Sequence, residues 1–313
     1  MNGPVLVTGA AGFAGSYVVQ ALGRPEVVTG WTHHAPPPGE IALLASWERV
    51  DLVNQSEVQS AIARLKPSAV IHCAGAPNVA HSWRDTLTPL SANVLATHHL
   101  FDALRRTGMS CRVVVVGSAE VYARSSAALT EQSPVAPSNP YGISKLAQEQ
   151  LAFRAAREDG IDVIVTRSFN HIGPRQSAAF AAPNMARQIA MIEAGVGEPV
   201  IKTGNLEAQR DLTDVRDVAR AYVALLDHGA SSTAYNVASG TVRTMRSVLE
   251  ALVSRARVQV RVETDAALMR PVDKPVVIGD ATRLRQATGW RPEVPFEQTL
   301  DDLLNYWRSI TIA

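Results

Sequence analysis

The chain has 313 residues, of which 46% are hydrophobic and 19% are charged, and its formal net charge at pH 7 is +1. These values are ordinary for a globular protein that can bury a full core, in one large domain or two coupled ones. Basic and acidic residues are interspersed along the sequence. The composition therefore argues against a nucleic-acid partner and against a membrane surface.

The two cysteines, Cys73 and Cys111, both lie in apolar, strand-like runs. We interpret them as free thiols of a reducing compartment, and not as a disulfide or a metal site. A strand pattern begins almost at the first residue, which leaves no room for a signal peptide. No apolar run reaches the ~18 residues of a membrane span. We expect a cytoplasmic protein without a bound metal.

Short apolar runs alternate with helical patterns through the first half of the chain. Continuous Val/Ile runs separated by helices are typical of a parallel sheet that is covered on both faces. The predicted fold class is therefore α/β, a doubly wound parallel sheet of the Rossmann type. Strands are expected at 5–7, 27–28, 50–52, 69–71, 113–116 and 163–165, with helices near 13–22, 56–65, 88–107 and 142–158.

After about residue 167 the pattern becomes irregular. It predicts a smaller, partly interleaved α/β domain that closes over the carboxyl edge of the sheet. The expected division is 1–167 with about 211–238 for the nucleotide-binding domain, and about 168–210 with 239–313 for the second domain. Helices are expected near 184–194, 215–227, 244–255 and 297–308, and strands near 199–202, 234–237, 258–263 and 276–278.

A glycine-rich segment follows the first strand directly and opens a helix. In Thr8-Gly9-Ala10-Ala11-Gly12-Phe13-Ala14-Gly15, the glycines allow a tight turn and let the backbone approach a pyrophosphate at the helix N-terminus. A glycine triplet alone is weak, but its place between a strand and a helix makes it a strong dinucleotide-binding signal.

The second strand ends at Gly30-Trp31-Thr32-His33-His34. A site that prefers NAD usually has an acidic residue there, which holds the ribose 2′-hydroxyl. None is present, so repulsion against a 2′-phosphate is absent and the segment leans slightly toward NADP. No arginine of the segment offers that phosphate a clear partner, and the cofactor is left as NADPH or NADH.

Tyr141 and Lys145 are four residues apart at the start of a long helical pattern, so they share one helix face. An ammonium near a phenol stabilises the phenolate and lowers the phenol pKa from its usual value of roughly 10. A phenol tuned in this way can exchange a proton with a sugar oxygen. Alone, the pair also fits a plain helix start with a half-buried tyrosine.

Taken together, these segments resemble the extended short-chain dehydrogenase/reductase family over nearly the whole chain. The resemblance implies that Asp51 and Leu52 contact the adenine and that Asn93 supports the site from a helix. The segment His72-Cys73-Ala74-Gly75 is similar to the family's strand end beneath the nicotinamide. The implied cofactor-binding residues are Gly9, Gly12, Phe13, Gly15, Thr32, Asp51, Leu52, Ala74, Gly75, Asn93, Tyr141 and Lys145.

Ser118-Ala119-Glu120-Val121-Tyr122 closes the fifth predicted strand. In the family this strand end carries the catalytic Ser or Thr, so the implied triad is Ser118, Tyr141 and Lys145. Dehydratases of the family have a catalytic glutamate at the position of Glu120, preceded by a polar residue where this chain has Ala119. Glu120 is therefore a fourth candidate, with a purely ordering role as its alternative.

The second half most resembles GDP-4-keto-6-deoxy-D-mannose reductases, on the segments 167–176 and 204–218. Arg175 stands where those reductases often have glycine, and Arg270-Pro271-Val272-Asp273 resembles the family's phosphate- and ribose-binding pair. The resemblance implies a GDP-linked 4-keto-6-deoxy sugar as substrate and a homodimer built from the helices near 90–107 and 142–158. The implied substrate-binding residues are Asn170, Arg175, Asn205, Arg210, Arg270 and Asp273.

The resemblance implies reduction of a C4 ketone, with Tyr141 as the proton donor and GDP-D-rhamnose as the expected product. Three other functions stay open at this point. They are a GDP-mannose 4,6-dehydratase, a nucleotide-sugar 4-epimerase that returns its NAD unchanged, and a non-catalytic sensor that only binds NADP. The sequence leaves the C4 stereochemistry, rhamnose or talose, undecided.

Overall fold

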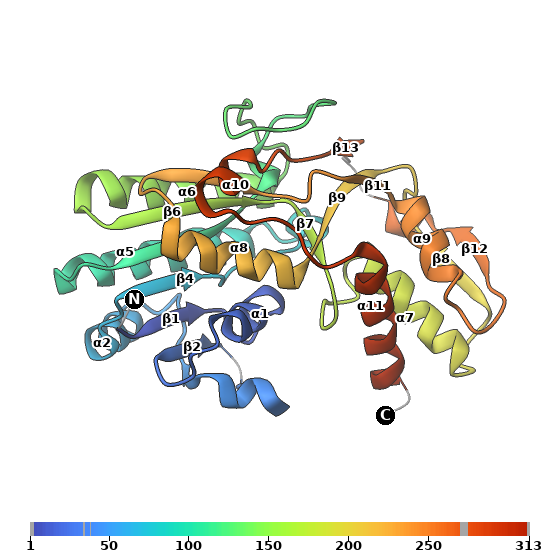
Figure 1. Cartoon of the computed structure of the whole chain (residues 1–313), viewed down its shortest axis with the longest axis horizontal. Helices are drawn as coiled ribbons and strands as arrows, with labels where there is room; N and C mark the ends of the chain where they lie inside the picture. The colour runs from blue at the N-terminus through green and yellow to red at the C-terminus, as the bar shows by residue number, and fades with distance from the viewer. Residues whose placement is uncertain (1–2, 34, 38, 270–274, 312–313) are drawn as a thin grey trace.

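The computed structural model describes residues 3–33, 35–37, 39–269 and 275–311. Its centre is a seven-stranded, all-parallel sheet with the strand order β10-β6-β5-β4-β1-β2-β3 (Figure 1). The predicted α/β class is confirmed, and the order 3-2-1-4-5-6 is that of doubly wound dinucleotide-binding sheets. The strands are β1 (Val5–Thr8), β2 (Val28–Thr32), β3 (Ser46–Arg49), β4 (Ala69–His72), β5 (Arg112–Ser118), β6 (Asp162–Ser168) and β10 (Thr233–Val237).

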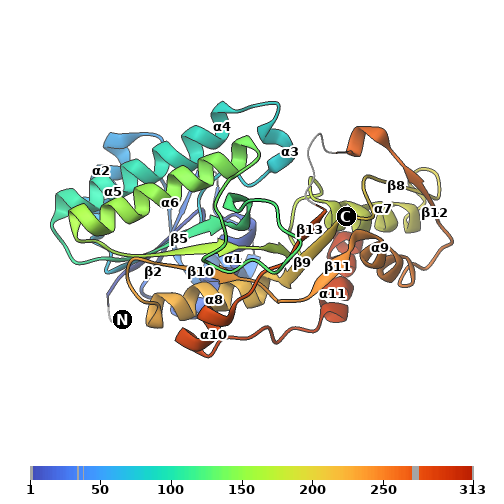
Figure 2. The same ribbon diagram turned by 90° about the horizontal axis from the view of Figure 1, so that it is seen from above.

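Helices cover both faces of this sheet, as Figures 1 and 2 show. One face carries α1 (Phe13–Leu22), α8 (Val215–His228) and α10 (Thr282–Thr288), and the other carries α2 (Gln55–Leu65), α5 (Ala96–Thr107) and α6 (Pro140–Asp159). Each face has its own buried hydrophobic cluster. Burial on both sides explains why the central strands are continuous apolar runs.

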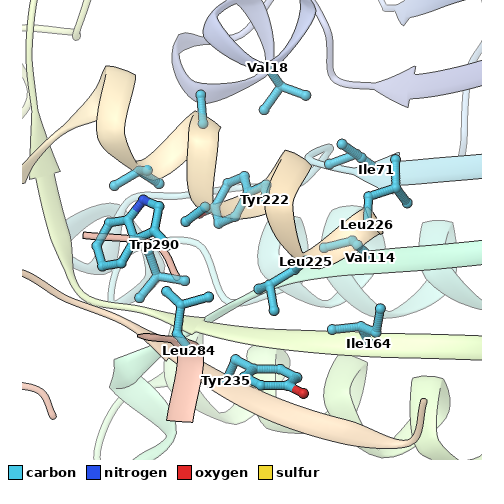
Figure 3. Packing of buried hydrophobic residues seen from close by; sticks show 14 of the residues in the cluster. Val18, Ile71, Val114, Ile164, Tyr222, Leu225, Leu226, Tyr235, Leu284 and Trp290 are labelled. Atoms are coloured by element: carbon cyan, nitrogen blue, oxygen red, sulfur yellow. The ribbon is translucent and has the colours of Figure 1, made fainter. Parts of the chain in front are cut away.

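The cluster beneath α8 links the sheet to the end of the chain (Figure 3). Tyr222 and Leu225 of α8 are fully buried against the sheet, and Leu284 of α10 packs into the same cluster. Trp290 closes it and donates a hydrogen bond from Nε1 to the backbone oxygen of Asp217, at 2.9 Å. The segment that carries Leu284 and Trp290 therefore packs against the sheet, although the expected division assigned 239–313 to the second domain.

The remaining elements gather beyond the carboxyl ends of the parallel strands (Figure 2). Most of them contribute to a third hydrophobic cluster, in which Ile189, Leu252 and Leu303 are fully buried, whereas Val277 belongs to the cluster beneath α8. The division of the chain into two domains stays a prediction. The elements are β7 (Asn170–Ile172), α7 (Ala181–Glu193), β8 (Val200–Thr203), β9 (Gln209–Asp214), β11 (Val242–Thr244), α9 (Met245–Val253), β12 (Arg261–Thr264), β13 (Val276–Val277) and α11 (Phe296–Thr311).

The predicted strand at 50–52 is wrong, because the third strand of the sheet is β3, Ser46–Arg49. β3 is the edge strand, and two of its four residues are exposed, so it lacks the apolar signature of the inner strands. The apolar Val50 follows it and donates its N–H to the oxygen of Thr32, at 3.1 Å. This shift places Arg49 beside Thr32.

The helical pattern at 88–107 consists of three pieces: α4 (Leu87–Pro89), a π-helical segment (Leu90–Leu95) and α5. Short elements without a clear period were not foreseen, among them α3 (Val79–Ser82), β7, β9, β11 and α10. Within the described ranges, no helix combines the length and apolar character that a membrane crossing requires.

Candidate active site

The glycine-rich turn is as tight as the sequence implied. Gly9 has φ +63°, in the left-handed region, and a Cβ there would lie 2.7 Å from the Cα of Ala74 at the end of β4. A Cβ at Gly15 would overlap the backbone oxygen of Gly9. Gly12 is the N-cap of α1 and brings no capping side chain to the first turn. Backbone N–H donors at a helix N-terminus suit a pyrophosphate.

Asn93 joins the end of β4 to helix α6. It is fully buried, its Oδ1 accepts from the N–H of Ala76 at 2.9 Å, and its Nδ2 donates to the hydroxyl of Ser144 at 2.9 Å. A Cβ on Gly75 would overlap the Oδ1 of Asn93 and would lie 3.8 Å from the Nζ of Lys145. The structure therefore brings Ala74, Gly75, Asn93 and Lys145 together, and a π-helical turn carries the asparagine.

Helix α6 begins at Pro140, directly after its N-cap residue Asn139. The side chain of Asn139 accepts from the N–H of Gly142 at 2.7 Å, and Pro140 takes the first helical position. Tyr141 follows and is 8% exposed, with its backbone N–H donating to the hydroxyl of Ser82 at 3.3 Å. The cap thus fixes the position of Tyr141 in the first turn of the helix.

Three of the four candidate catalytic residues meet at this phenol. The side chain of Ser118 lies close enough to the phenol of Tyr141 to lower its pKa, and the charge of the Glu120 carboxylate raises that pKa. Glu120 is itself held by Asn139, whose Nδ2 donates to its Oε2 at 2.9 Å. Ser118 and Glu120 reach this position because β5 ends directly in the short 3-10 turn Ala119–Val121.

The expected lowering of the Tyr141 pKa is wrong for this structure. Burial raises the pKa of Tyr141 to about 12, the Ser118 hydrogen bond opposes this rise, and the charge of Glu120 adds to it. Lys145 instead donates from Nζ to the oxygen of Val116 and to the Oε1 of Gln148, each at 2.7 Å. The phenol is therefore fully protonated near neutral pH, as a proton donor must be.

Lys145 occupies an unusual position for a lysine, since only 6% of its surface is exposed. Burial disfavours its charged form and lowers the pKa of Lys145 to about 8. The interaction with Cys73 opposes this effect, and hydrogen bonds that accept from the ammonium favour its charged form. The ammonium and the neutral amine are therefore both accessible near physiological pH.

The adenosine end of the predicted cofactor site contains a residue that the sequence analysis missed. Parallel pairing sets Arg49 of β3 directly beside the buried Thr32 of β2. Arg49 is exposed, and together with His33, Ala35 and Pro36 it lines a cavity of about 390 Å³. Assigning Ser46–Arg49 to a strand would have revealed it, because neighbouring parallel strands end at one edge.

Asp51 and Leu52 follow β3. A backbone group of Asp51 contacts a side chain of α2, and a backbone group of Leu52 contacts a side chain of α5. The Oδ1 of Asp51 accepts from the N–H of Val53 at 2.9 Å, and its own N–H donates to Glu57. The backbone oxygen of Leu52 is 3.0 Å from the Nδ1 of His99. The predicted adenine contacts are thus at the carboxyl edge of the sheet, in a turn that is tied down on both sides.

The predicted substrate residues lie on the second set of elements. Asn170 is exposed on β7, and β7 pairs with β9, where Arg210 is buried and donates to the oxygen of Gln209 at 2.8 Å. Asn205 accepts from the N–H of Glu207 at 3.0 Å in the loop before β9. Arg270 and Asp273 lie outside the described residues.

The guanidinium of Arg175 contacts α1, and its role in substrate binding stays a prediction. The guanidinium carbon lies 3.9 Å from the ring centroid of Tyr17, and Nη2 donates to the Oε1 of Gln20 at 3.2 Å. Its φ of +72° is one that glycine adopts freely. This backbone angle explains why glycine suits the position, and the cation–π contact accompanies the arginine that occupies it.

Comparison with known proteins agrees with this geometry. The family model described as GDP-mannose 4,6 dehydratase matches residues 6–303. The chain belongs to this family, within the extended short-chain dehydrogenase/reductases. It is 35% identical over 312 residues to the GDP-6-deoxy-D-mannose reductase of Pseudomonas aeruginosa, covering 99% of this chain and 98% of that protein.

Solved structures give the same fold. RMD from Pseudomonas aeruginosa, solved with NADPH, has a TM-score of 0.85 at 33% identity, over 99% of this chain and 100% of that one. The UDP-glucose 4-epimerase of Thermus thermophilus, solved with NAD, also has a TM-score of 0.85, at 27% identity, over 97% of this chain and 99% of that one. Nicotinamide cofactors of both types are therefore found on this fold.

The buried Lys145 predicts a stability that depends on pH. Its pKa is about 8 in the folded protein, against an ordinary value of 10.5, so the folded state releases the proton first as pH rises. Between pH 8 and 10.5 the unfolded state holds more protons, and the stability of the wild type relative to Lys145→Met should rise by up to about 1.4 kcal/mol per pH unit. Urea unfolding at pH 7.5, 8.5 and 9.5 measures this difference.

The matched control for that series is Lys202→Met, which removes an exposed lysine. Its stability should follow that of the wild type at all three pH values. Parallel stability curves for wild type and Lys145→Met would contradict the burial of the ammonium.

Proposed function

We propose that the protein is a nucleotide-sugar 4-ketoreductase that converts GDP-4-keto-6-deoxy-D-mannose to GDP-D-rhamnose with NAD(P)H. The observation that carries the reaction type is the approach of Ser118 to the phenol of Tyr141 at the carboxyl edge, on the helix that also carries Lys145, whose Nζ lies near Gly75. The similarity to the Pseudomonas reductase over nearly the full length of both chains supports the substrate.

The residues present fit a nicotinamide dinucleotide. A Cβ at Gly9 or Gly15 would clash with the backbone of the turn or of Ala74, and a Cβ at Gly75 would clash with Asn93, so glycine keeps the backbone in the tight turn that a pyrophosphate can approach. The pyrophosphate would lie on the N-terminus of α1, the adenosine ribose near Thr32, and the nicotinamide ribose near Lys145. When bound, the reduced cofactor would supply the hydride.

The protein's own contribution is to hold and protonate the ketone. Tyr141 would donate its proton to the C4 oxygen as negative charge develops there, and the hydroxyl of Ser118 would donate a hydrogen bond to the same oxygen. Because its pKa is high, Tyr141 would keep its proton until negative charge develops on the C4 oxygen. Lys145 would donate to the ribose from a buried, fixed position.

Arg210 and Asn170 are the described candidates for the nucleotide diphosphate and the sugar, from the adjacent strands β9 and β7. An arginine provides charge and several donors for phosphate oxygens. Asn205 and Arg175 stay weaker candidates. Arg270 and Asp273, predicted from the family resemblance, complete the proposed set.

A 4,6-dehydratase is the second candidate, and Glu120 favours it. Its carboxylate accepts a hydrogen bond from Asn139 and raises the pKa of the Tyr141 phenol. A base for a sugar C5 proton would therefore be available. The reductase is preferred because Ala119 replaces the polar residue that the dehydratases have before this glutamate. An epimerase would share Ser118, Tyr141 and Lys145.

Arg49 supports NADPH as the preferred cofactor. Arg49 is exposed and pairs with Thr32, near which the adenosine ribose would lie, and His33 lines the same cavity. A 2′-phosphate there would gain a charge-assisted hydrogen bond that a 2′-hydroxyl cannot match. The two free cysteines are consistent with a reducing, cytoplasmic compartment.

A homodimer through the face of α4, α5 and α6 is also proposed. Leu87, Leu90 and Ile143 are 72%, 47% and 53% exposed there, which is unusual for large apolar side chains on neighbouring segments. The three segments lie on one side of the molecule (Figure 2). A second copy of the same face would bury these side chains.

The substitution Tyr141→Phe tests the reductase directly. NADPH oxidation with freshly prepared GDP-4-keto-6-deoxymannose should fall on the order of 10²–10⁴-fold, because the proton donor is lost. NADPH binding, followed by fluorescence, should be nearly unchanged. Full turnover in this variant would contradict the assignment, and water loss from GDP-mannose without net cofactor change would favour the dehydratase.

Arg49→Gln tests the cofactor preference. Loss of one charge-assisted hydrogen bond should weaken NADPH binding on the order of 10- to 100-fold and leave NADH binding unchanged. Equilibrium titration with each cofactor measures both values, and NADH serves as the internal control. An equal effect on both cofactors would show that Arg49 does not contact the 2′-phosphate.

Ile143→Asp tests the dimer. A carboxylate at the centre of an apolar interface should convert the dimer to a monomer at micromolar concentration, as measured by light scattering during size-exclusion chromatography. Leu43→Asp, at a side chain that is 79% exposed on another surface, is the control and should leave the dimer intact. A wild-type protein that is monomeric would contradict the proposal.

A further inference from the structure

A chain of buried polar side chains runs from Lys145 through the sheet to β1. Gln148, Thr97, His72 and Thr8 are each 0% exposed, and none of them was assigned a role in the reaction. They come from four different elements: α6, α5, β4 and β1. Buried polar groups cost free energy unless they are hydrogen-bonded, so their pairing has to be accounted for.

Donor counting gives each hydrogen bond in this chain a direction. The Nζ of Lys145 donates to the Oε1 of Gln148 at 2.7 Å, which leaves the Nε2 of Gln148 to donate to the hydroxyl of Thr97 at 2.8 Å. The Thr97 hydroxyl donates its single hydrogen to the oxygen of Asn93 at 2.6 Å. It must therefore accept from every other partner.

That requirement fixes the tautomer of His72. Its Nε2 lies 2.9 Å from the Thr97 hydroxyl and must donate to it, so its Nδ1 accepts from the hydroxyl of Thr8 at 2.7 Å. Thr8 in turn accepts from the N–H of Ala74 at 3.3 Å. A neutral imidazole fits this pattern, and burial lowers the pKa of His72 to about 3.

Only one orientation of the network lets each polar side-chain atom of Thr8, His72, Thr97 and Gln148 make a hydrogen bond. In that orientation the amide of Gln148 cannot flip, because its Nε2 would then face Lys145 and its Oε1 would face a hydroxyl with no hydrogen to give. Gln148 therefore always presents an acceptor to the Nζ of Lys145. The second acceptor, the oxygen of Val116, is part of the backbone and cannot be varied.

We propose that Gln148 is a positioning residue, locked by Thr97 and His72, that holds the ammonium of Lys145 in place beside Gly75. The proposal rests on the proposed function only in that Lys145 serves the reacting centre. Its structural content is independent of the substrate. Through Thr97, His72 and Thr8, the orientation of the Gln148 side-chain amide depends on β1, the strand that precedes the glycine-rich turn.

The charge state of Lys145 reports on this interaction. The other titratable groups around it are His72, Cys73 and Tyr141, with Glu120 acting on the phenol and Tyr222 near Cys73. Burial lowers the pKa of His72 to about 3 and raises the pKa values of Cys73 and Tyr141 to about 12. His72, Cys73 and Tyr141 therefore keep their charge states across the range in which Lys145 titrates.

The chain contains only four lysines, so NMR of protein with carbon-13-labelled lysine side chains can follow each ammonium separately. Lys66 and Lys202 are exposed and far from this chain of side chains in sequence, so their titration curves should be the same in wild type and variant. In Gln148→Met, which keeps the length of the side chain and removes the acceptor, the midpoint for Lys145 should fall by about one to two pH units.

The pair Thr97→Val and Thr97→Ser is the matched control. Valine keeps the shape and removes the hydroxyl that orients Gln148, so the midpoint should fall in the same direction. Serine keeps the hydroxyl, so the midpoint should stay at its wild-type value. This pair carries the test if Gln148→Met does not fold, as judged by circular dichroism.

Activity provides a second readout. The alkaline limb of the kcat/KM profile for the ketoreductase should move to lower pH in Gln148→Met by the same amount as the NMR midpoint, with a loss of about 10-fold at pH 8. An unchanged midpoint in Gln148→Met and Thr97→Val would overturn the inference. Failure of the wild type to reduce the sugar would overturn the proposed function alone, because the titration needs no substrate.

Discussion

The structure depends on the burial of polar side chains at one edge of a parallel sheet. Lys145 and Tyr141 are 6% and 8% exposed, and Asn93 is fully buried. Such groups persist in a protein interior only where each has partners, and here the partners are backbone oxygens, amides and hydroxyls from the surrounding strands and helices. The same pairing that makes the burial tolerable also fixes the geometry of the site, so no folding event on cofactor binding is needed to assemble it.

The sheet and the elements beyond its carboxyl edge contribute different residues to the proposed site. The sheet and its glycine-rich turn provide rigid positions for a dinucleotide, because the strands are packed on both faces and end together at one edge. The elements beyond that edge have their own hydrophobic cluster and bring Asn170 and Arg210 on adjacent strands.

Much of this could be predicted from the sequence, because the relevant signals are local. The glycine-rich turn follows a strand within 15 residues, and Tyr141 and Lys145 are separated by one helical turn. What could not be predicted depends on contacts between distant segments. Arg49 lies beside Thr32 only because β3 pairs with β2. β3 is an edge strand with exposed residues, so it lacks the apolar pattern by which a strand is recognised in a sequence. The pKa of Tyr141 rises because surrounding elements bury the phenol, and the spacing to Lys145 contains no information about burial. The chain from Gln148 to Thr8 spans 140 residues of sequence and is visible only once the four elements are packed.

A crystal structure with NADPH tests the central claim most directly. We expect the pyrophosphate at the N-terminus of α1, the nicotinamide ring over Gly75 with its ribose hydrogen-bonded to Lys145, and the hydroxyl of Tyr141 facing the reactive carbon of the ring. A complex in which the ring lies away from Gly75, with protein between it and the phenol of Tyr141, would contradict the proposed site.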